Sequence, residues 1–264
     1  MRLPIVQIDA FAERAFQGNP AAVMPLDAWL DDATLLAIAA ENNLSETAFL
    51  VPDASGAADY ELRWFTPASE VVLCGHATLA SGHYLLSSDA ARDRVTFRTR
   101  KSGVLEVARD GDGYLMALPA WRAEPRPLPA IVAGLGLNAA AETLWHPNRY
   151  GLVVLDTADQ VLALDPDFRA LAREGDVLTI VTAPGTDSDV MSRVFAPGAG
   201  IDEDPVTGSA HSVLTPYWAA RLGRADFTAY QASRRGGRLA CRLDGDRAIL
   251  GGRAVTVLEG VFLL

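Results

Sequence analysis

The chain has 264 residues, of which 50% are hydrophobic and 21% are charged, enough for one large domain or for two lobes with separate cores. Its formal net charge of -10 excludes nucleic acid as a partner, because no basic stripe is present to neutralise phosphates. The densest basic group, Arg234, Arg235 and Arg238, is interrupted by two glycines and predicts a solvated hairpin tip.

Cysteine usage and hydropathy bear on the compartment. The two cysteines lie far apart in the sequence, which argues against a disulfide framework or a structural zinc site and favours a reducing cytoplasm. The first apolar run meets Asp9 too early for a signal peptide. No stretch approaches the roughly 18 uninterrupted apolar residues that a membrane span needs. We therefore expect a cytoplasmic protein without membrane contact.

Short apolar runs separated by turn residues dominate the first part of the chain and predict strands. The expected strands cover residues 3–11, 21–24, 47–51, 60–65, 95–100, 104–109 and 114–118. Asp31 or Asp32 can cap a helix that ends near Asn42 and Asn43, residues that tolerate a left-handed C-terminal cap. Glu46 would then lie at a helix-to-strand junction.

A second helix is expected over residues 76–86, whose alanines and leucines cover most of its circumference and predict burial on all sides. Residues 120–129 contain three prolines and form the best linker candidate. Beyond the linker we expect small helices and further strands. The helices cover 130–135 and 168–173, and the strands cover 149–155, 177–182, 190–195, 238–243, 248–251 and 254–264.

The chain contains a short internal repeat. Residues 65–67 and 74–77 read Phe-Thr-Pro and Cys-Gly-His-Ala, while residues 195–197 and 207–210 read Phe-Ala-Pro and Thr-Gly-Ser-Ala. Each copy combines a strand, a proline turn, a polar loop and a glycine at the start of an apolar helix. This pattern predicts two lobes related by a pseudo-twofold.

The repeat also suggests a chemistry. Gly75 and Gly208 would let backbone N–H groups at two helix starts approach a ligand, and each helix dipole adds roughly half a positive charge there. Two opposed helix N-termini could hold one carboxylate, so a small carboxylate is the expected substrate. The acidic loop at residues 202–204 either adds functional carboxylates at the second helix or supplies helix caps.

Four blocks together resemble a known family. They are Gly-Asn-Pro-Ala-Ala-Val at 18–23, Asn-Leu-Ser-Glu-Thr-Ala-Phe at 43–49, Cys-Gly-His-Ala-Thr-Leu-Ala at 74–80 and Asp-Pro-Val-Thr-Gly-Ser-Ala-His at 204–211. In order and spacing they are similar to the signature blocks of the PhzF family of phenazine-biosynthesis isomerases. The resemblance covers essentially the whole chain.

The resemblance implies an α+β protein with the diaminopimelate epimerase fold. Two pseudo-symmetric lobes are expected, each a barrel-like β-sheet wrapped around a central helix, with the active site in the cleft between them. The first lobe would comprise residues 1–117 and a returning C-terminal strand at about 254–264. The second would comprise residues 118–253. Family members are commonly homodimers, so a homodimer is expected.

Carried over by position, the resemblance assigns catalysis to Glu46, His76, Asp204 and Ser209. Glu46 would act as the acid/base that moves a proton on the substrate. The remaining expected substrate-binding residues surround these in the motif blocks. They are Gly75, Gly208, Thr207, Cys74 and Asn19.

The sequence also bears on metal chemistry and on thiol chemistry. No two histidines have the spacing of a metal motif with a nearby acid, which predicts no catalytic metal, and the family requires no cofactor. In two-thiol epimerases of this fold a cysteine precedes each glycine, but here Cys74 is matched by Thr207. A helix N-terminus lowers the pKa of a cysteine, so Cys74 could still serve a one-base reaction. We interpret it as a packing residue.

The predicted function is therefore an isomerase that shifts a proton on a small carboxylate, including cyclic ones that resemble dihydro-hydroxyanthranilate. A cysteine-dependent racemase or epimerase, or a hydroxyproline-type dehydratase, on the same fold is one alternative. A non-catalytic small-molecule binding module is the other. Substitution of Cys74 or Glu46 would distinguish the first alternative, and proton exchange in deuterated water would distinguish the second.

Overall fold

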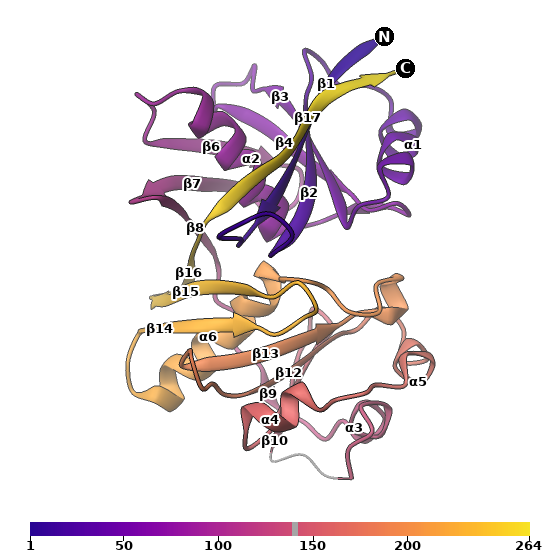
Figure 1. The fold of residues 1–264 in the computed structure, drawn as a ribbon, viewed down its shortest axis with the longest axis vertical. Coiled ribbons are helices and arrows are strands. Elements are labelled where there is room, and N and C mark those ends of the chain that lie inside the picture. Colours follow the sequence, from indigo (N-terminus) through magenta and orange to yellow (C-terminus); the bar gives the residue numbers. More distant parts are fainter. Residues whose placement is uncertain (139–141) are drawn as a thin grey trace. The chain divides into compact units, whose positions relative to one another are not determined.

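The computed structural model describes residues 1–138 and 142–264, which divide into two compact units. Unit 1 comprises Met1–Leu118 and Leu250–Leu264, and unit 2 comprises Pro119–Ile249 (Figure 1). These boundaries lie close to those expected at residues 117 and 254. Each unit is an α+β assembly in which a sheet surrounds one long helix.

Unit 1 contains two helices, α1 (Asp32–Asn42) and α2 (Gly75–Ser88). Its strands are β1 (Arg2–Ala10), β2 (Asn19–Pro25), β3 (Glu46–Pro52), β4 (Tyr60–Phe65), β5 (Glu70–Val71), β6 (Arg94–Thr99), β7 (Val104–Asp110), β8 (Gly113–Pro119) and β17 (Ala254–Leu263). β17 pairs with β1 in antiparallel register from Arg2 opposite Leu263 to Ala10 opposite Ala254, as expected for the returning C-terminal strand.

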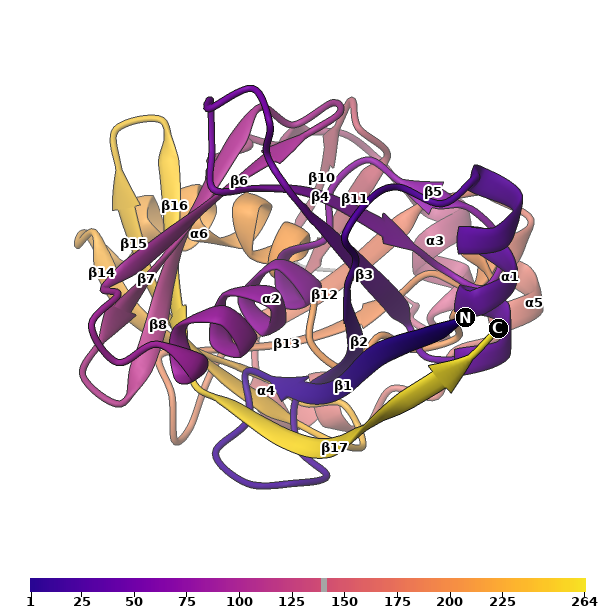
Figure 2. The ribbon, with the colours of Figure 1, turned by 90° about the horizontal axis from the view of Figure 1, so that it is seen from above.

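The central helix of unit 1 is α2, which contacts β1, β2, β3, β6 and β7 (Figure 2). Every residue of its first two turns, from Gly75 to Gly82, is buried, which confirms the expected buried helix. Gly82 is required for this packing, because a Cβ there would lie 2.4 Å from Cγ1 of Val107 on β7. The sheet can therefore close tightly around the helix.

Unit 2 contains the helices α3 (Pro129–Gly134), α4 (Ala158–Leu162), α5 (Phe168–Ala172) and α6 (Gly208–Leu222), and the 3-10 turn η1 (Pro197–Ala199). Its strands are β9 (Glu124–Pro125), β10 (Glu142–His146), β11 (Tyr150–Val154), β12 (Leu178–Pro184), β13 (Val190–Phe195), β14 (Asp226–Gln231) and β15 (Gly237–Asp244). β16 (Arg247–Gly252) begins in unit 2 and ends in unit 1, whose second segment starts at Leu250. The basic stretch near Arg234 forms the turn between β14 and β15, as predicted.

The two units share one pattern of strand pairing. In unit 1, β1–β2 is antiparallel, β2–β3 parallel, β3–β4 antiparallel, β4–β6 parallel and β6–β7 antiparallel. In unit 2, β10–β11, β11–β12, β12–β13, β13–β14 and β14–β15 follow the same alternation. The long helices α2 and α6 occupy equivalent places, after β4 and β13. The predicted repeat is therefore present in the topology.

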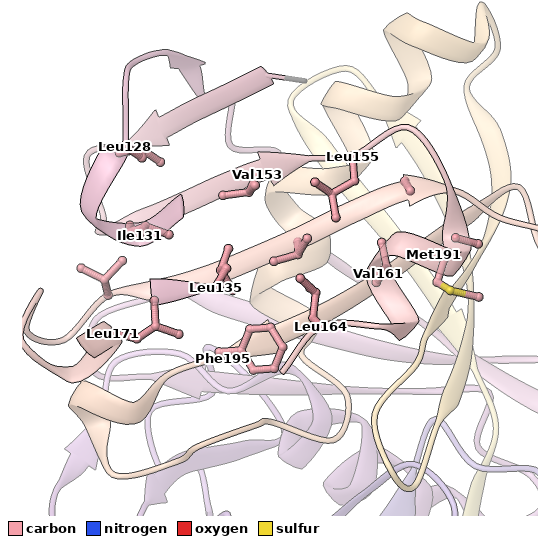
Figure 3. Close-up of a cluster of buried hydrophobic side chains, with 14 residues drawn as sticks. Leu128, Ile131, Leu135, Val153, Leu155, Val161, Leu164, Leu171, Met191 and Phe195 are labelled. Carbon is pink, nitrogen blue, oxygen red and sulfur yellow. The ribbon is translucent and has the colours of Figure 1, made fainter. Parts of the chain in front are cut away.

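A hydrophobic cluster in unit 2 joins the short helices to the sheet (Figure 3). Ile131 of α3, Val161 of α4 and Leu171 of α5 pack with Val153 of β11 and Phe195 of β13. Unit 1 has a comparable cluster in which α1 covers β2, β3 and β4. These clusters pack the smaller helices against the sheets that surround the central helices.

Sequence patterns missed several elements of unit 2, including β10, β14 and α4. The helix α4 did carry a signal, because Thr157 and Gln160 form a reciprocal capping box at its start. None of the helices in residues 1–138 and 142–264 has the length and apolar character needed to cross a bilayer.

Candidate active site

Glu46 occupies the first position of β3, immediately after the turn that ends α1. Asp31 caps the start of α1 by accepting a hydrogen bond from the Thr34 N–H, and Asn43 closes its end with a left-handed φ of 49°. Both caps were predicted from the sequence. β3 then runs parallel to β2, with Glu46 beside Ala21. The Glu46 side chain is only 12% exposed.

His76 is the second residue of α2 and lies next to Glu46. Its Nε2 is 3.0 Å from Glu46 Oε2, a contact that has ion-pair distance but not hydrogen-bond geometry. The sulfur of Cys74, the N-cap residue of α2, lies 3.5 Å from His76 Nδ1 and 3.9 Å from Nε2. Carboxylate, imidazole and thiol are thus gathered at the N-terminus of a buried helix.

Asn19 supports the imidazole from the start of β2. Its Nδ2 lies 3.2 Å from His76 Nδ1, and its side chain is fully buried. Gly18 makes this position possible, because a Cβ at residue 18 would lie 2.1 Å from the Ala10 carbonyl oxygen and its φ is +64°. The sequence predicted Asn19 as a substrate-binding residue, whereas in the structure its amide contacts His76.

The surroundings raise the pKa values of both His76 and Cys74. Burial alone would lower the pKa of His76, but its interactions with Cys74 and Glu46 outweigh burial and raise that pKa well above its ordinary value. Burial raises the pKa of the Cys74 thiol to about 11, and the Glu46 carboxylate adds to this. The expected lowering by the helix N-terminus is therefore overcome, and Cys74 is a neutral thiol at pH 7.

The equivalent helix start in unit 2 is built from hydroxyl and amide groups. The Thr207 hydroxyl donates to Asp204 Oδ2, and the Thr207 N–H donates to Gln231 Oε1 over 2.9 Å. Gln231 Nε2 donates to the Asp204 carbonyl oxygen over 2.7 Å and to Thr207 Oγ1 over 3.1 Å. All three residues are buried, so the loop from 204 to 207 is locked to β14.

His211 lies one turn into α6 and is fully buried. Its Nδ1 is 2.8 Å from the Thr207 carbonyl oxygen, so this nitrogen carries a proton and donates. Burial lowers the pKa of His211 to about 4, which makes it neutral at pH 7. Within the described residues its Nε2 has no hydrogen-bond partner.

The structure brings the predicted residues together in two groups, one in each unit. Glu46, Cys74, His76 and Asn19 meet at α2 with Gly75, the first residue of that helix. In unit 2, Gly208 and the half-buried Ser209 begin α6 directly after Thr207, which bonds Asp204.

The acidic loop 202–204 and its surroundings add two details. The loop is divided in role, because Glu203 pairs with Arg193 at 2.7 Å whereas Asp204 is buried. Sequence reasoning missed Gln231. Gln231 is buried on β14 on the same side as Phe227 and Ala229, and a buried amide requires partners.

One cluster among the described residues has atoms suited to hold a metal ion. Glu46, Cys74 and His76 each offer a ligand atom, and these atoms all lie within 4.8 Å of one another. The sequence prediction considered pairs of histidines near an acid, whereas this cluster contains one histidine, a cysteine two residues before it and a carboxylate 28 residues before that cysteine.

Comparisons with known proteins show which proteins the chain is similar to. The family model described as phenazine biosynthesis-like protein, PhzC-PhzF, matches residues 8–260. An uncharacterized isomerase of Pseudomonas aeruginosa is 50% identical over 266 residues and covers all of both chains.

Two solved structures extend the comparison. A PhzF-family crystal structure from Enterococcus faecalis has 43% identity and a TM-score of 0.91, with complete coverage of both chains. A hydroxyproline epimerase from Agrobacterium vitis has 13% identity and a TM-score of 0.65, and covers 98% of this chain and 92% of its own. The second likeness concerns the fold alone.

Proposed function

The chain belongs to the phenazine biosynthesis-like (PhzC-PhzF) family, and we propose that it is an isomerase in which Glu46 moves a proton between two carbons of a small carboxylate. The observation that carries this proposal is the buried contact of Glu46 with His76 at the start of α2. Proton transfer needs a base held close to its substrate and shielded from water, and a β-strand start beside a helix N-terminus supplies both.

The proposed chemistry is redox-neutral and needs only residues of this chain. The Glu46 carboxylate takes a proton from a substrate carbon, and the C–H electron pair moves into a conjugated enol system. The resulting carboxylic acid then returns the proton to a different carbon, which regenerates the carboxylate. The imidazolium of His76 stabilises the charge of Glu46 before the transfer.

The helix N-terminus contributes to the same step. The first N–H groups of an α-helix have no partner within the helix, and the dipole places partial positive charge there. In α2 these groups belong to the turn that begins at Gly75. They would stabilise negative charge that develops on the substrate as the proton leaves carbon. The suggested substrates are small carboxylates, including rings similar to dihydro-hydroxyanthranilate.

The cysteine-dependent alternative receives less support from the geometry. A thiol acts as a base or nucleophile through its thiolate, and the raised pKa of Cys74 disfavours that form. Its counterpart Thr207 has no thiol, and the Thr207 hydroxyl is already committed to Asp204. A two-thiol reaction would therefore lack its second base.

The test is a screen of cyclic and β-hydroxylated carboxylates in deuterated water, with proton exchange followed by NMR. Wild-type protein should exchange at least one substrate hydrogen, and Glu46→Gln should slow that exchange by about 10²- to 10⁴-fold. Cys74→Ser should exchange at a rate close to wild type. Circular dichroism would verify that both variants fold.

The other outcomes identify the alternatives. Loss of exchange in Cys74→Ser with little effect of Glu46→Gln would instead support the cysteine-dependent racemase, epimerase or dehydratase. Binding of a carboxylate by wild type without any exchange would support a binding module.

A further inference from the structure

The start of α2 has the composition of a transition-metal site. Cys74 supplies a thiol sulfur, His76 an imidazole nitrogen and Glu46 a carboxylate oxygen, and these atoms lie within 4.8 Å of one another. Zinc is bound in proteins by these three ligand types, whereas Mg²⁺ and Ca²⁺ prefer oxygen ligands. The cluster therefore selects for a borderline-soft divalent ion.

The distances are close to those that one ion would require. With Zn–N and Zn–O bonds near 2.0 to 2.2 Å and a Zn–S bond near 2.3 Å, tetrahedral ligands lie roughly 3.4 to 3.6 Å apart. The Cys74 Sγ to His76 Nε2 distance is 3.9 Å, and the His76 Nε2 to Glu46 Oε2 distance is 3.0 Å. These two distances lie within about half an ångström of the tetrahedral values, and the remaining distance, from Cys74 Sγ to the Glu46 carboxylate, is at most 4.8 Å.

The hydrogen bonding of Glu46 and of Cys74 is compatible with a bound cation. Glu46 Oε2 is buried, and no hydrogen bond reaches it within the part of the chain that the structure describes. A buried carboxylate oxygen without a hydrogen bond is costly, and a bound metal ion would compensate its charge in place of the proton on His76, whose Nε2 lies 3.0 Å away. The Cys74 side chain makes no capping hydrogen bond at the start of α2.

Asn19 gives the imidazole the support that metal-bound histidines have. Its amide lies 3.2 Å from His76 Nδ1, which leaves Nε2 directed towards the cluster. A metal on Nε2 requires a proton on Nδ1 and an acceptor beside it. Turning over the Asn19 amide exchanges its oxygen and nitrogen, so the same side chain meets that requirement.

We propose that Cys74, His76 and Glu46 form a binding site for a zinc-type divalent ion, which on binding occupies the atoms that proton transfer requires. Three protein ligands leave a fourth position open to water or to an anionic ligand, as in zinc sites that exchange ligands. The ion is thus an inhibitory ligand of this cluster rather than a cofactor. Metal binding is measured without substrate and does not depend on the isomerase assignment, whereas the inhibitory role of the ion rests on the proposed function.

The test uses Co²⁺ as a spectroscopic probe and Zn²⁺ as its competitor. Protein freed of metal by a chelator is titrated with Co²⁺ while thiolate-to-cobalt charge transfer and the visible bands of tetrahedral cobalt are recorded. One Co²⁺ per chain should give both signals, and Zn²⁺ should abolish them. A titration without a thiolate band would overturn the proposal.

Matched variants assign the ligands. Cys74→Ala should abolish the thiolate band, whereas Cys241→Ala should keep it, because Cys241 is an equally buried thiol in unit 2. His76→Asn should weaken Co²⁺ binding at least tenfold, whereas His83→Asn on the same helix should not. A band that persists in Cys74→Ala, or that vanishes in Cys241→Ala, would contradict the proposed ligands. Glu46→Gln should likewise weaken Co²⁺ binding at least tenfold. Thermal unfolding of every variant separates loss of a ligand from loss of folding.

Discussion

The starts of α2 and α6 occupy equivalent places in the two units but carry different chemistry. At α2, the imidazole of His76 contacts an acidic side chain, Glu46, and a thiol. At α6, the hydroxyl of Thr207 is held by Asp204 and Gln231. The same strand order therefore provides a helix N-terminus twice, and the side chains around the two helix starts differ.

The two buried histidines sharpen the contrast. His76 has a raised pKa because charged neighbours outweigh burial, whereas His211 has a lowered pKa because burial acts almost alone. The protonated form of the histidine is therefore stabilised at α2, whereas the neutral form is favoured at α6. Under the proposed function, this contrast favours proton transfer at α2 of unit 1 and a positioning role for the 204–207 loop of unit 2.

The largest expected effect comes from removing the imidazolium of His76 at the start of α2. His76→Asn should slow proton exchange on the carboxylate identified in the screen by about 10³-fold, equivalent to about 4 kcal/mol. His83→Asn is the matched control, because His83 lies on the same helix but bonds Tyr114 and Thr256. NMR exchange rates check both variants. Equal slowing in both would show a structural effect on α2 rather than a loss at the site.

Breaking the lock at α6 should be the next largest effect. Gln231→Leu removes three hydrogen bonds and leaves the Thr207 N–H and the Asp204 carbonyl without their partner, which should cost about 3 kcal/mol of unfolding free energy. Gln160→Leu, at the exposed cap of α4, should cost about 1 kcal/mol.

Denaturant unfolding measures both costs, and amide exchange locates them. Lost protection should be confined to the 204–207 loop and the first turn of α6. Protection lost equally around Glu46 would contradict the assignment of this network to unit 2 alone.

Acid should reveal the neutral state of His211. In the unfolded chain its pKa is about 6.5, whereas burial lowers the folded value to about 4. Between these values the unfolded chain binds the extra proton, so stability is full above about pH 6.5 and is lost as the pH falls towards 4.

His211→Asn isolates this contribution. Asn keeps a donor for the Thr207 carbonyl but cannot titrate, so it should remove about 2 kcal/mol of the stability loss between pH 8 and pH 5. Denaturant unfolding at the two pH values measures the difference. An unchanged pH dependence in the variant would mean that folding does not shift the pKa of His211.

The smallest expected effect concerns the thiol. Cys74→Ser should change proton exchange only a few-fold and cost about 1 kcal/mol of stability. Cys241→Ser is a matched control, because burial raises its pKa to about 12 as well. Thermal unfolding and exchange rates compare the two. A selective collapse of exchange in Cys74→Ser would transfer the catalytic role from the carboxylate to sulfur.

Local sequence signals predicted the elements around Glu46 well. Asp31 and Asn43 are short-range caps, so their structural effect depends on immediate neighbours, and α1 has the expected ends. β14 was missed because its apolar signal is short. The buried Phe227 and Ala229 alternate with polar residues at exposed positions. Strand pairing with β13 and β15, which is long-range, stabilises it instead.

The motif resemblance located the candidate side chains, but their environments required the fold. The direction of the Cys74 pKa depends on burial beneath the sheet and on a carboxylate 28 positions away in the chain. The partnership of Thr207 with Gln231 likewise joins a helix start to a later strand. Such long-range contacts leave no periodic signal in the sequence.

The pairing of β1 with β17 fixes an order of events during synthesis on the ribosome. The sheet that carries Glu46 and surrounds α2 stays incomplete until residues 254–263 have been translated, and all of unit 2 is translated first. Because chains emerge from the N-terminus onwards, the nascent first unit must wait with an unpaired edge at β1 while the second becomes available for folding. Assembly of the proton-transfer cluster is therefore coupled to the last strand of the sheet.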